Sequence, residues 1–205
     1  MSTSPKLLLD FDGTLVLENS SRLLMNELFS QSHSAPQLIL RWLLRGKLRR
    51  LFELLLAVAS RLYGCRDTQL VIVMMFFRED MTAHSNEIFD RVAGKLTLNL
   101  QLKEYFESDF EIVSTGLEPL IGRYLLLHPN LRVSGVVASM YDAKSGPQLM
   151  PIGQKVDVLK KYSSWRYITD YDYEATLIQR NYAPHCTSKA ISGPGVSPLF
   201  QLDLG

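Results

Sequence analysis

The stretch Lys6-Leu7-Leu8-Leu9-Asp10-Phe11-Asp12-Gly13-Thr14-Leu15-Val16 decides how the rest of this 205-residue sequence is interpreted. Residues 7–9 form a short apolar run that is typical of a strand buried on both faces of a parallel sheet. Asp10 and Asp12 follow at the carboxyl end of that strand, and Gly13 opens a turn. Because open parallel sheets bind their ligands at this edge, we expect chemistry at the two aspartates.

Two carboxylates this close repel each other unless a cation or a proton lies between them. Mg²⁺ suits such a pair, because it binds one or two carboxylates together with waters and the phosphate oxygens of a substrate. Gly13 would let the backbone approach that phosphate, and Thr14 could hydrogen-bond within the turn. The simpler alternative is a solvated Asp-x-Asp-Gly turn, since Asp and Gly both favour turns. On this stretch alone, both interpretations stand.

Composition is that of an ordinary folded domain. With 46% hydrophobic and 21% charged residues, the chain can bury one core and a small subdomain. The formal charge of +1 gives no reason to expect a nucleic-acid partner. Cys65 and Cys186 match neither a disulfide framework nor a zinc site, which favours a reduced, cytoplasmic compartment. We also expect no signal peptide and no membrane span, because no apolar run approaches about 20 residues.

Residues 17–98 have helical periodicity and no clear alternating strand, which predicts a helical insertion after the first strand. Within it, residues 36–64 are rich in Leu and basic residues and contain one acid. Arg41, Arg45 and Arg49 recur every four residues and would share one stripe of a helix. This pattern indicates a membrane-surface contact or a lid over an anionic substrate. The alternative is a solvated basic face on an ordinary helix.

An α/β alternation follows the insertion. We expect, in order, a strand at 110–113, a helix at 120–127, a strand at 131–138, a turn at 145–147, a helix at 155–162, a strand at 165–169 and a short strand at 186–191 before a loose tail. The predicted fold class is therefore α/β. A Rossmann-like parallel sheet core would comprise residues 1–16 and 99–205, with an all-helical domain at 17–98.

The segment Asp-Phe-Asp-Gly-Thr-Leu after a hydrophobic strand resembles the first motif of the haloacid dehalogenase-like (HAD) superfamily. In phosphatases of that superfamily the first Asp is the nucleophile and the second is the acid/base, which implies these roles for Asp10 and Asp12. The insertion is similar in position to the helical cap of the phosphoserine phosphatase-like branch. The resemblance implies a magnesium-dependent phosphatase that hydrolyses a phosphate monoester through an aspartyl-phosphate intermediate.

Two later stretches resemble the next motifs, in the expected order. Ile112-Val113-Ser114-Thr115-Gly116 is similar to the second motif, whose hydroxyl and backbone amides bind phosphate oxygens, which implies that Ser114, Thr115 and Gly116 bind the substrate phosphate. Gly153-Gln154-Lys155-Val156 is similar to the third motif, whose lysine offsets the charge of an aspartate and a phosphate. Lys155 is therefore a catalytic and phosphate-binding candidate.

Residues 167–178 resemble the fourth motif, which implies that Asp170 binds the metal. Two positions depart from the usual pattern, because Thr169 replaces a Gly and Glu174 replaces an Asp. A longer Glu could reach a metal through a water, but with a different geometry. The implied metal set is Asp10, Asp12, Asp170 and Glu174, with Asp172 as the alternative to Glu174.

The Arg- and Leu-rich insertion and residues 114–120 and 137–155 are also loosely similar to C-type phosphatidylglycerophosphate phosphatases. This implies a small phosphorylated substrate, with a phospholipid or another anionic ester as the candidates. It also implies a cytoplasmic protein with peripheral association at the inner membrane face as one option. The alternative function is a catalytically weak HAD-fold protein that binds a membrane surface or a protein partner through its basic cap. The sequence determines neither the physiological substrate nor the oligomeric state.

Overall fold

A central sheet of seven strands organises the computed structural model, which describes residues 5–45, 50, 58, 68–142, 145–182, 185–191 and 199–204. The strands are β1 (Lys6–Leu9), β2 (Phe110–Leu117), β3 (Val133–Asp142), β4 (Gly146–Gln148), β5 (Trp165–Thr169), β6 (Cys186–Ile191) and β7 (Leu199–Leu204). Their order is β4-β3-β2-β1-β5-β7-β6, with β3, β2, β1 and β5 parallel and the others antiparallel to their neighbours. β1 therefore lies between β2 and β5.

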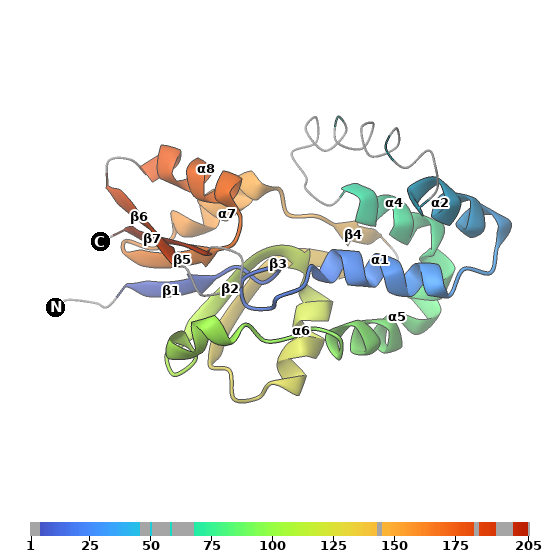
Figure 1. The fold of residues 1–205 in the computed structure, drawn as a ribbon, viewed down its shortest axis with the longest axis horizontal. Helices are drawn as coiled ribbons and strands as arrows, with labels where there is room; N and C mark the ends of the chain where they lie inside the picture. The colour runs from blue at the N-terminus through green and yellow to red at the C-terminus, as the bar shows by residue number, and fades with distance from the viewer. Residues whose placement is uncertain are drawn as a thin grey trace.

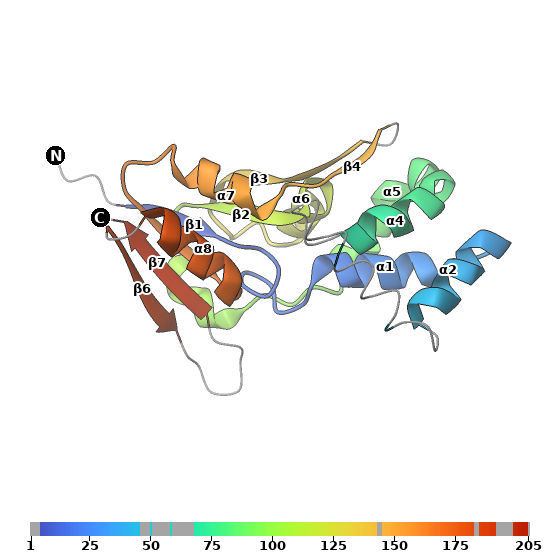
Figure 2. The ribbon, with the colours of Figure 1, turned by 90° about the horizontal axis from the view of Figure 1, so that it is seen from above.

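Helices cover both faces of this sheet and extend beyond one end of it (Figure 1). They are α1 (Ser20–Ser30), α2 (Ala35–Arg45), α4 (Thr68–Phe76), α5 (Arg78–Ala93), the 3₁₀ helix η1 (Leu100–Tyr105), α6 (Glu118–Leu127), α7 (Ile152–Leu159) and α8 (Asp172–Tyr182). α6 lies on one face, and α7 and α8 lie on the other (Figures 1 and 2). α1, α2, α4 and α5 precede β2 in sequence and group together beyond the sheet.

The two faces of β1 enter two different hydrophobic clusters, as alternation along a strand requires. Leu7 and Leu9 pack into a cluster with residues of α1, α5 and α6. Leu8 packs into the second cluster, with residues of α7 and α8. The strand is thus buried on both faces, as its apolar run predicts, and the predicted fold class is confirmed.

The chain enters and leaves the helical insertion at one place. Val16 and Leu98 form an isolated antiparallel bridge, the Leu17 N–H donates to the Thr97 carbonyl at 2.9 Å, and the Asn99 N–H donates to the Leu15 carbonyl at 2.9 Å. The division into domains at residues 17 and 98 stays a prediction.

Several predicted elements differ from those observed. The expected loose tail contains a further strand, β7, which pairs with β5 and β6. β2 runs four residues beyond the predicted 110–113, with a register shift against β3 between Val113 and Leu117. The helix expected at 155–162 spans Ile152–Leu159, and it begins directly after Pro151, which is its N-cap and has extended backbone dihedrals.

Part of the predicted basic stripe lies outside the described residues. The side chain of Arg41 is described, and its guanidinium donates to the Phe29 carbonyl at 3.1 Å. The Arg45 side chain and all of Arg49 lie outside the described residues, as does Cys65. Among the described helices, none has the length and apolarity needed to cross a membrane.

Candidate active site

Four segments meet at the carboxyl ends of β1, β2 and β5. The Asp10 N–H donates to the Ile168 carbonyl at 2.9 Å, and the Asp170 N–H donates to Thr14 Oγ1 at 2.8 Å. These bonds tie the loop after β1 to the end of β5. Lys155, from the first turns of α7, reaches the same point from another segment. Residues far apart in sequence therefore share one site, as the parallel sheet predicts.

Asp10 is a buried carboxylate with a partner for each oxygen. Oδ1 accepts the Phe11 N–H at 2.8 Å. Oδ2 lies 3.0 Å from Lys155 Nζ, and the Thr169 hydroxyl donates to it at 3.4 Å. Thr169, which departs from the usual motif in the sequence, therefore contacts the predicted nucleophile directly. These donors fix the orientation of the carboxylate and stabilise its charge.

Asp12 connects the sheet edge to the helical insertion. Its Oδ1 accepts the N–H of Ser20, the first residue of α1, at 2.7 Å. The first N–H groups of a helix lack intrahelical partners, and the N-terminus carries partial positive charge, so an anionic acceptor is favourable there. Asp12 is thereby held in one orientation at the mouth of the insertion.

Gly13 allows Asp170 to approach the loop after β1. Gly13 has φ +71°, and a Cβ placed on it would lie 2.2 Å from Asp170 Oδ2. The Thr14 hydroxyl is 3.5 Å from Asp170 Oδ1. Glycine is therefore required at position 13 for two reasons: the backbone is in the left-handed region, and the Asp170 carboxylate occupies the space that a Cβ would need.

The second motif faces Asp12 across a narrow space. Ser114 is buried, and its Oγ accepts the Gly116 N–H at 3.0 Å. A Cβ on Gly116 would lie 3.3 Å from Ser114 Oγ and 3.5 Å from both Asp12 Oδ2 and Ser20 Oγ. The carbonyl of Thr115 accepts the Ser139 hydroxyl at 2.6 Å. The predicted phosphate-binding segment and the predicted acid/base thus adjoin each other.

Lys155 is a fully buried cation between two carboxylates. Its Nζ lies 3.0 Å from Asp10 Oδ2 and 2.8 Å from Glu174 Oε2. Burial lowers the pKa of Lys155, but attraction to Asp10 and Glu174 outweighs it and raises the pKa above the ordinary value. The lysine therefore stays protonated at neutral pH, and its charge is compensated within the site.

Glu174 lies in a setting that the motif does not imply. Its carboxylate is buried, accepts two contacts from Lys155 Nζ at 2.8 and 3.0 Å, and accepts the Tyr167 hydroxyl. Asp172, the alternative, is exposed at the start of α8. The structure therefore brings Glu174 to Lys155, and its assignment as a metal ligand stays a prediction.

Mg²⁺ can be accommodated by two carboxylates with backbone oxygen and water, so the site needs few side-chain ligands. Among the described residues, no group of three or more His, Cys, Asp or Glu side chains forms a metal-binding cluster. Asp10 and Asp170 nevertheless lie at the same sheet edge, next to Thr169 and Thr14, and supply hard oxygen donors. This donor set suits Mg²⁺ better than a softer metal.

The sequence missed three contributors to the site. Thr169 was noted as a departure from the motif, without a role. Ser20 begins α1, and no local signal in the sequence reveals that its N–H would bind Asp12. Tyr167 is two residues before Thr169 on the same strand, so alternation places both on one face. The signal in the sequence was the Tyr167 hydroxyl, a polar group on a strand that ends at the site.

Comparisons with known proteins give weak likenesses. No family model matches the chain. No curated protein matches it either. Among solved structures, a HAD-family hydrolase from Salmonella enterica serovar Typhi matches with 12% identity and a TM-score of 0.43, over 77% of this chain and 51% of that one. The chain thus spans about half the length of that protein. A phosphoserine phosphatase, solved as an analogue of its phospho-aspartyl intermediate, matches with 14% identity and a TM-score of 0.40, over 78% of this chain and 72% of that one. At these values neither likeness bears on activity.

Proposed function

We propose that this chain is a phosphatase of the HAD-like superfamily that hydrolyses a phosphate monoester through an aspartyl-phosphate intermediate. The observation that carries the proposal is the direct contact of buried Lys155 with Asp10, next to Asp12, at the carboxyl edge of a parallel sheet. A buried ion pair is costly to assemble, and its location at a ligand-binding edge indicates use in chemistry.

In this reaction Asp10 attacks phosphorus, and the bond between phosphorus and the leaving oxygen breaks. Asp12 gives a proton to that oxygen, and then removes a proton from the water that hydrolyses the aspartyl-phosphate. The Ser20 N–H, which donates to Asp12 Oδ1, orients the acid for both transfers. Asp10 is regenerated when phosphate leaves.

The substrate phosphate would be bound by groups from the second and third motifs. The Ser114 hydroxyl and the backbone N–H groups at Thr115 and Gly116 are the candidate donors, and the Gly116 N–H would have to exchange Ser114 Oγ for a phosphate oxygen. The N–H groups of Lys155 contact Asp10, Glu174 and Tyr167, so its ammonium would act on the phosphate through its charge. Lys155 adds positive charge where negative charge accumulates on the phosphoryl oxygens. Gly116 leaves room beside Asp12, since a Cβ there would contact three side chains.

Asp10, the backbone carbonyl of Asp12 and Asp170 would hold Mg²⁺. When bound, the ion would supply electrostatic stabilisation of the phosphoryl oxygens. Asp170 is oriented for this by Thr14, whose hydroxyl contacts both its backbone N–H and its carboxylate.

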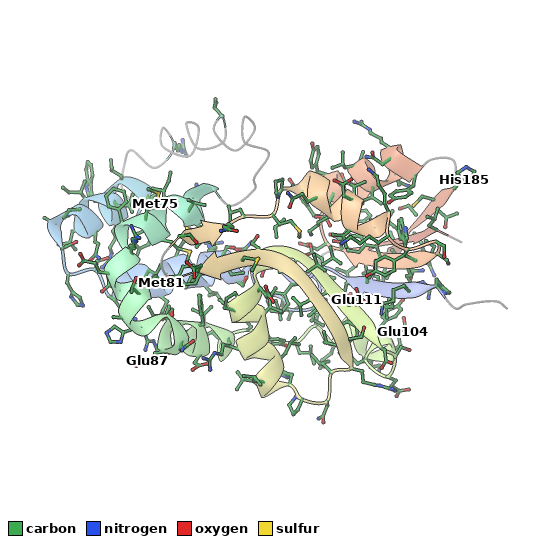
Figure 3. All side chains as sticks on the ribbon, turned by 180° about the vertical axis from the view of Figure 1, so that it is seen from behind. Met75, Met81, Glu87, Glu104, Glu111 and His185 are labelled. Carbon is green, nitrogen blue, oxygen red and sulfur yellow. The ribbon has the colours of Figure 1, made fainter. Side chains whose placement is uncertain are left out.

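A second candidate function is peripheral association with an anionic membrane, which would suit a phospholipid substrate. Three large apolar side chains of α2 are exposed, namely Leu38, Ile39 and Trp42, beside the basic Arg41. Met75 of α4 is also exposed, and it lies on the insertion far from the His185 end of the sheet (Figure 3). Exposed apolar and basic side chains on one helix are typical of a surface that enters the lipid headgroup region.

Hydrolysis of p-nitrophenyl phosphate, with and without Mg²⁺, tests the proposed phosphatase. Asp10→Asn keeps nearly the same shape and removes the nucleophile, so we expect kcat to fall by about a thousandfold or more. The variant should stay folded, because Glu174 still pairs with Lys155. Asp157→Asn is the matched control, since Asp157 is an exposed residue whose partner is Lys160.

Near wild-type turnover in Asp10→Asn would refute the mechanism. A folded wild-type protein that binds Mg²⁺ and hydrolyses no phosphate ester would instead favour the catalytically weak binding protein. A panel of phosphate esters, including a phosphatidylglycerophosphate in mixed micelles, would then identify the substrate class of an active enzyme.

A further inference from the structure

We infer that Tyr167 is a positioning residue that acts through Glu174 to hold Lys155 against Asp10. This inference rests on the proposed phosphatase function and extends it to residues that none of the four motifs assigns to this role. Its basis is a closed set of contacts among three buried side chains, Tyr167 of β5, Lys155 of α7 and Glu174 of α8.

The lysine needs such a partner, because its side chain has four rotatable carbon–carbon bonds and a compact charged end. Asp10 contacts Nζ at 3.0 Å from one side. Glu174 contacts it at 2.8 and 3.0 Å, and the Tyr167 oxygen lies 3.2 Å away. Three acceptors therefore use the three N–H donors of the ammonium group. Together these contacts hold Nζ in a single position next to Asp10.

Tyr167 also fixes Glu174 itself. Its hydroxyl donates to Glu174 Oε1, while the same carboxylate accepts from Lys155. With both oxygens engaged, the carboxylate is held towards the lysine and is not available to turn to another ligand. These contacts give Glu174 a positioning role, and the Mg²⁺ dependence of Glu174→Gln distinguishes it from the metal ligation that the motif implies.

The phenol is a rigid support because the sheet holds it. Tyr167 is a central residue of β5, paired with Leu8 of β1 on one side and with Leu202 of β7 on the other. Its ring lies in the hydrophobic cluster that α7 and α8 cover. Burial first, and then the charges of Asp10 and Glu174, raise the pKa of Tyr167 well above its ordinary value. The hydroxyl therefore keeps its proton at neutral pH, and its acceptors are Glu174 Oε1 and, at 3.4 Å, the Val113 carbonyl.

Tyr167→Phe tests this role, because it retains the ring in the cluster and removes the hydroxyl. We expect kcat for p-nitrophenyl phosphate to fall about tenfold to a hundredfold, with KM changed less than twofold. The Mg²⁺ concentration for half-maximal activity should stay that of the wild type in Tyr167→Phe and in Glu174→Gln. In Asp170→Asn it should rise.

Tyr124→Phe is the matched control. Tyr124 is also buried, and its hydroxyl has no hydrogen-bond partner in the described structure. The same chemical change there should leave kcat unaltered. All variants are assayed at a temperature well below their unfolding midpoints, so that each measured rate is that of folded enzyme.

The double variant Tyr167→Phe/Glu174→Gln separates positioning from general loss of packing. If Tyr167 acts through Glu174, the double variant has the same kcat as Glu174→Gln alone. Losses that multiply would overturn the inference, and so would a wild-type kcat in Tyr167→Phe, while the proposed phosphatase would survive both results. A wild-type protein without phosphatase activity would overturn the proposed function and this inference together.

Discussion

At the scale of single residues, Gly13 is the position where the site leaves least room for change. Gly13→Ala would place a methyl group 2.2 Å from the Asp170 carboxylate, in a left-handed backbone conformation. We expect a stability loss of at least about 1–2 kcal/mol in urea unfolding. Because Asp170 must move, the Mg²⁺ concentration for half-maximal activity should also rise.

Gly122→Ala provides the control for this prediction. Gly122 lies within α6, and a Cβ there would meet no atom within 4 Å. Alanine should therefore stabilise the helix by about 0.5–1 kcal/mol and leave activity unchanged. An unchanged Mg²⁺ requirement in Gly13→Ala would separate Asp170 from the metal site.

The sequence predicted which side chains would lie together at the sheet edge better than it predicted their contacts. Asp10, Asp12, Lys155 and Asp170 follow from strand ends and motif order, because the carboxyl ends of parallel strands meet at one edge. The partner of Glu174 could not be predicted in this way. Spacing along α8 sets which residues share a helix face, whereas Lys155 reaches that face from α7, and the packing of the two helices decides their contact.

At the scale of elements, α1 joins the site to the rest of the insertion. The N–H of its first residue, Ser20, donates to Asp12. Near its other end, Glu27 forms ion pairs with Arg91 of α5 and with Lys95, which follows α5, with N···O distances of 2.7 and 2.6 Å. Burial raises the pKa of Glu27, but the hydrogen bonds from Lys95 and Arg91 outweigh it and lower the pKa below the ordinary value.

Glu27→Gln should therefore cost about 1–2 kcal/mol at pH 7, a low value because Arg91 and Lys95 are about half exposed. A carboxylate whose folded pKa is depressed contributes its stability above the unfolded pKa, which is near 4.5. The difference between wild type and variant should hold down to that pH and shrink as pH falls through the lower folded pKa. Thermal unfolding across pH 3–7 measures it.

Glu87→Gln controls for the general effect of removing an acid. Glu87 is an exposed residue of α5, 3.6 Å from His84, and it points away from the body of the molecule (Figure 3). Its replacement should change the unfolding midpoint little at any pH. A constant difference for Glu27→Gln down to pH 3 would contradict the ion pair.

α2 is the element that tests membrane association. Trp42 is largely exposed and Trp165 is fully buried, so a shift of tryptophan emission on binding would come from Trp42. We expect a blue shift with vesicles containing phosphatidylglycerol, reduced at high salt, since each basic residue near an anionic surface contributes about 1 kcal/mol. Arg41→Gln should weaken binding, as should the triple change with Arg45 and Arg49.

Leu126→Ser is the control for the apolar part of that surface. Leu126 is more exposed than the apolar α2 residues and belongs to α6, outside the insertion. It should bind vesicles like the wild type, whereas Ile39→Ser should bind less. Equal binding by all variants, or none by the wild type, would leave α2 as an ordinary solvated helix.

At the scale of the whole molecule, the sequence predicted the fold class because apolar runs and helical periodicity alternate after residue 110. β7 could not be predicted in the same way. A Ser-, Gly- and Pro-rich stretch precedes it, and its reason to be a strand is its pairing with β5 on one side and β6 on the other. This pairing is a tertiary contact, and the local sequence pattern of residues 199–204 does not reveal it.

The position of β1 between β2 and β5 also determines when the site can assemble as the chain is synthesised. β1 is synthesised before both of its partner strands, and Thr169, which donates to Asp10, follows Asp10 by 159 residues. Contacts between such distant segments form slowly and late, after the helices between them. During synthesis Asp10 therefore emerges long before Lys155, and β5 emerges before its other partner, β7. The contacts among Asp10, Lys155 and Thr169 would therefore form only after β5 has been synthesised and can pair with β1 and β7.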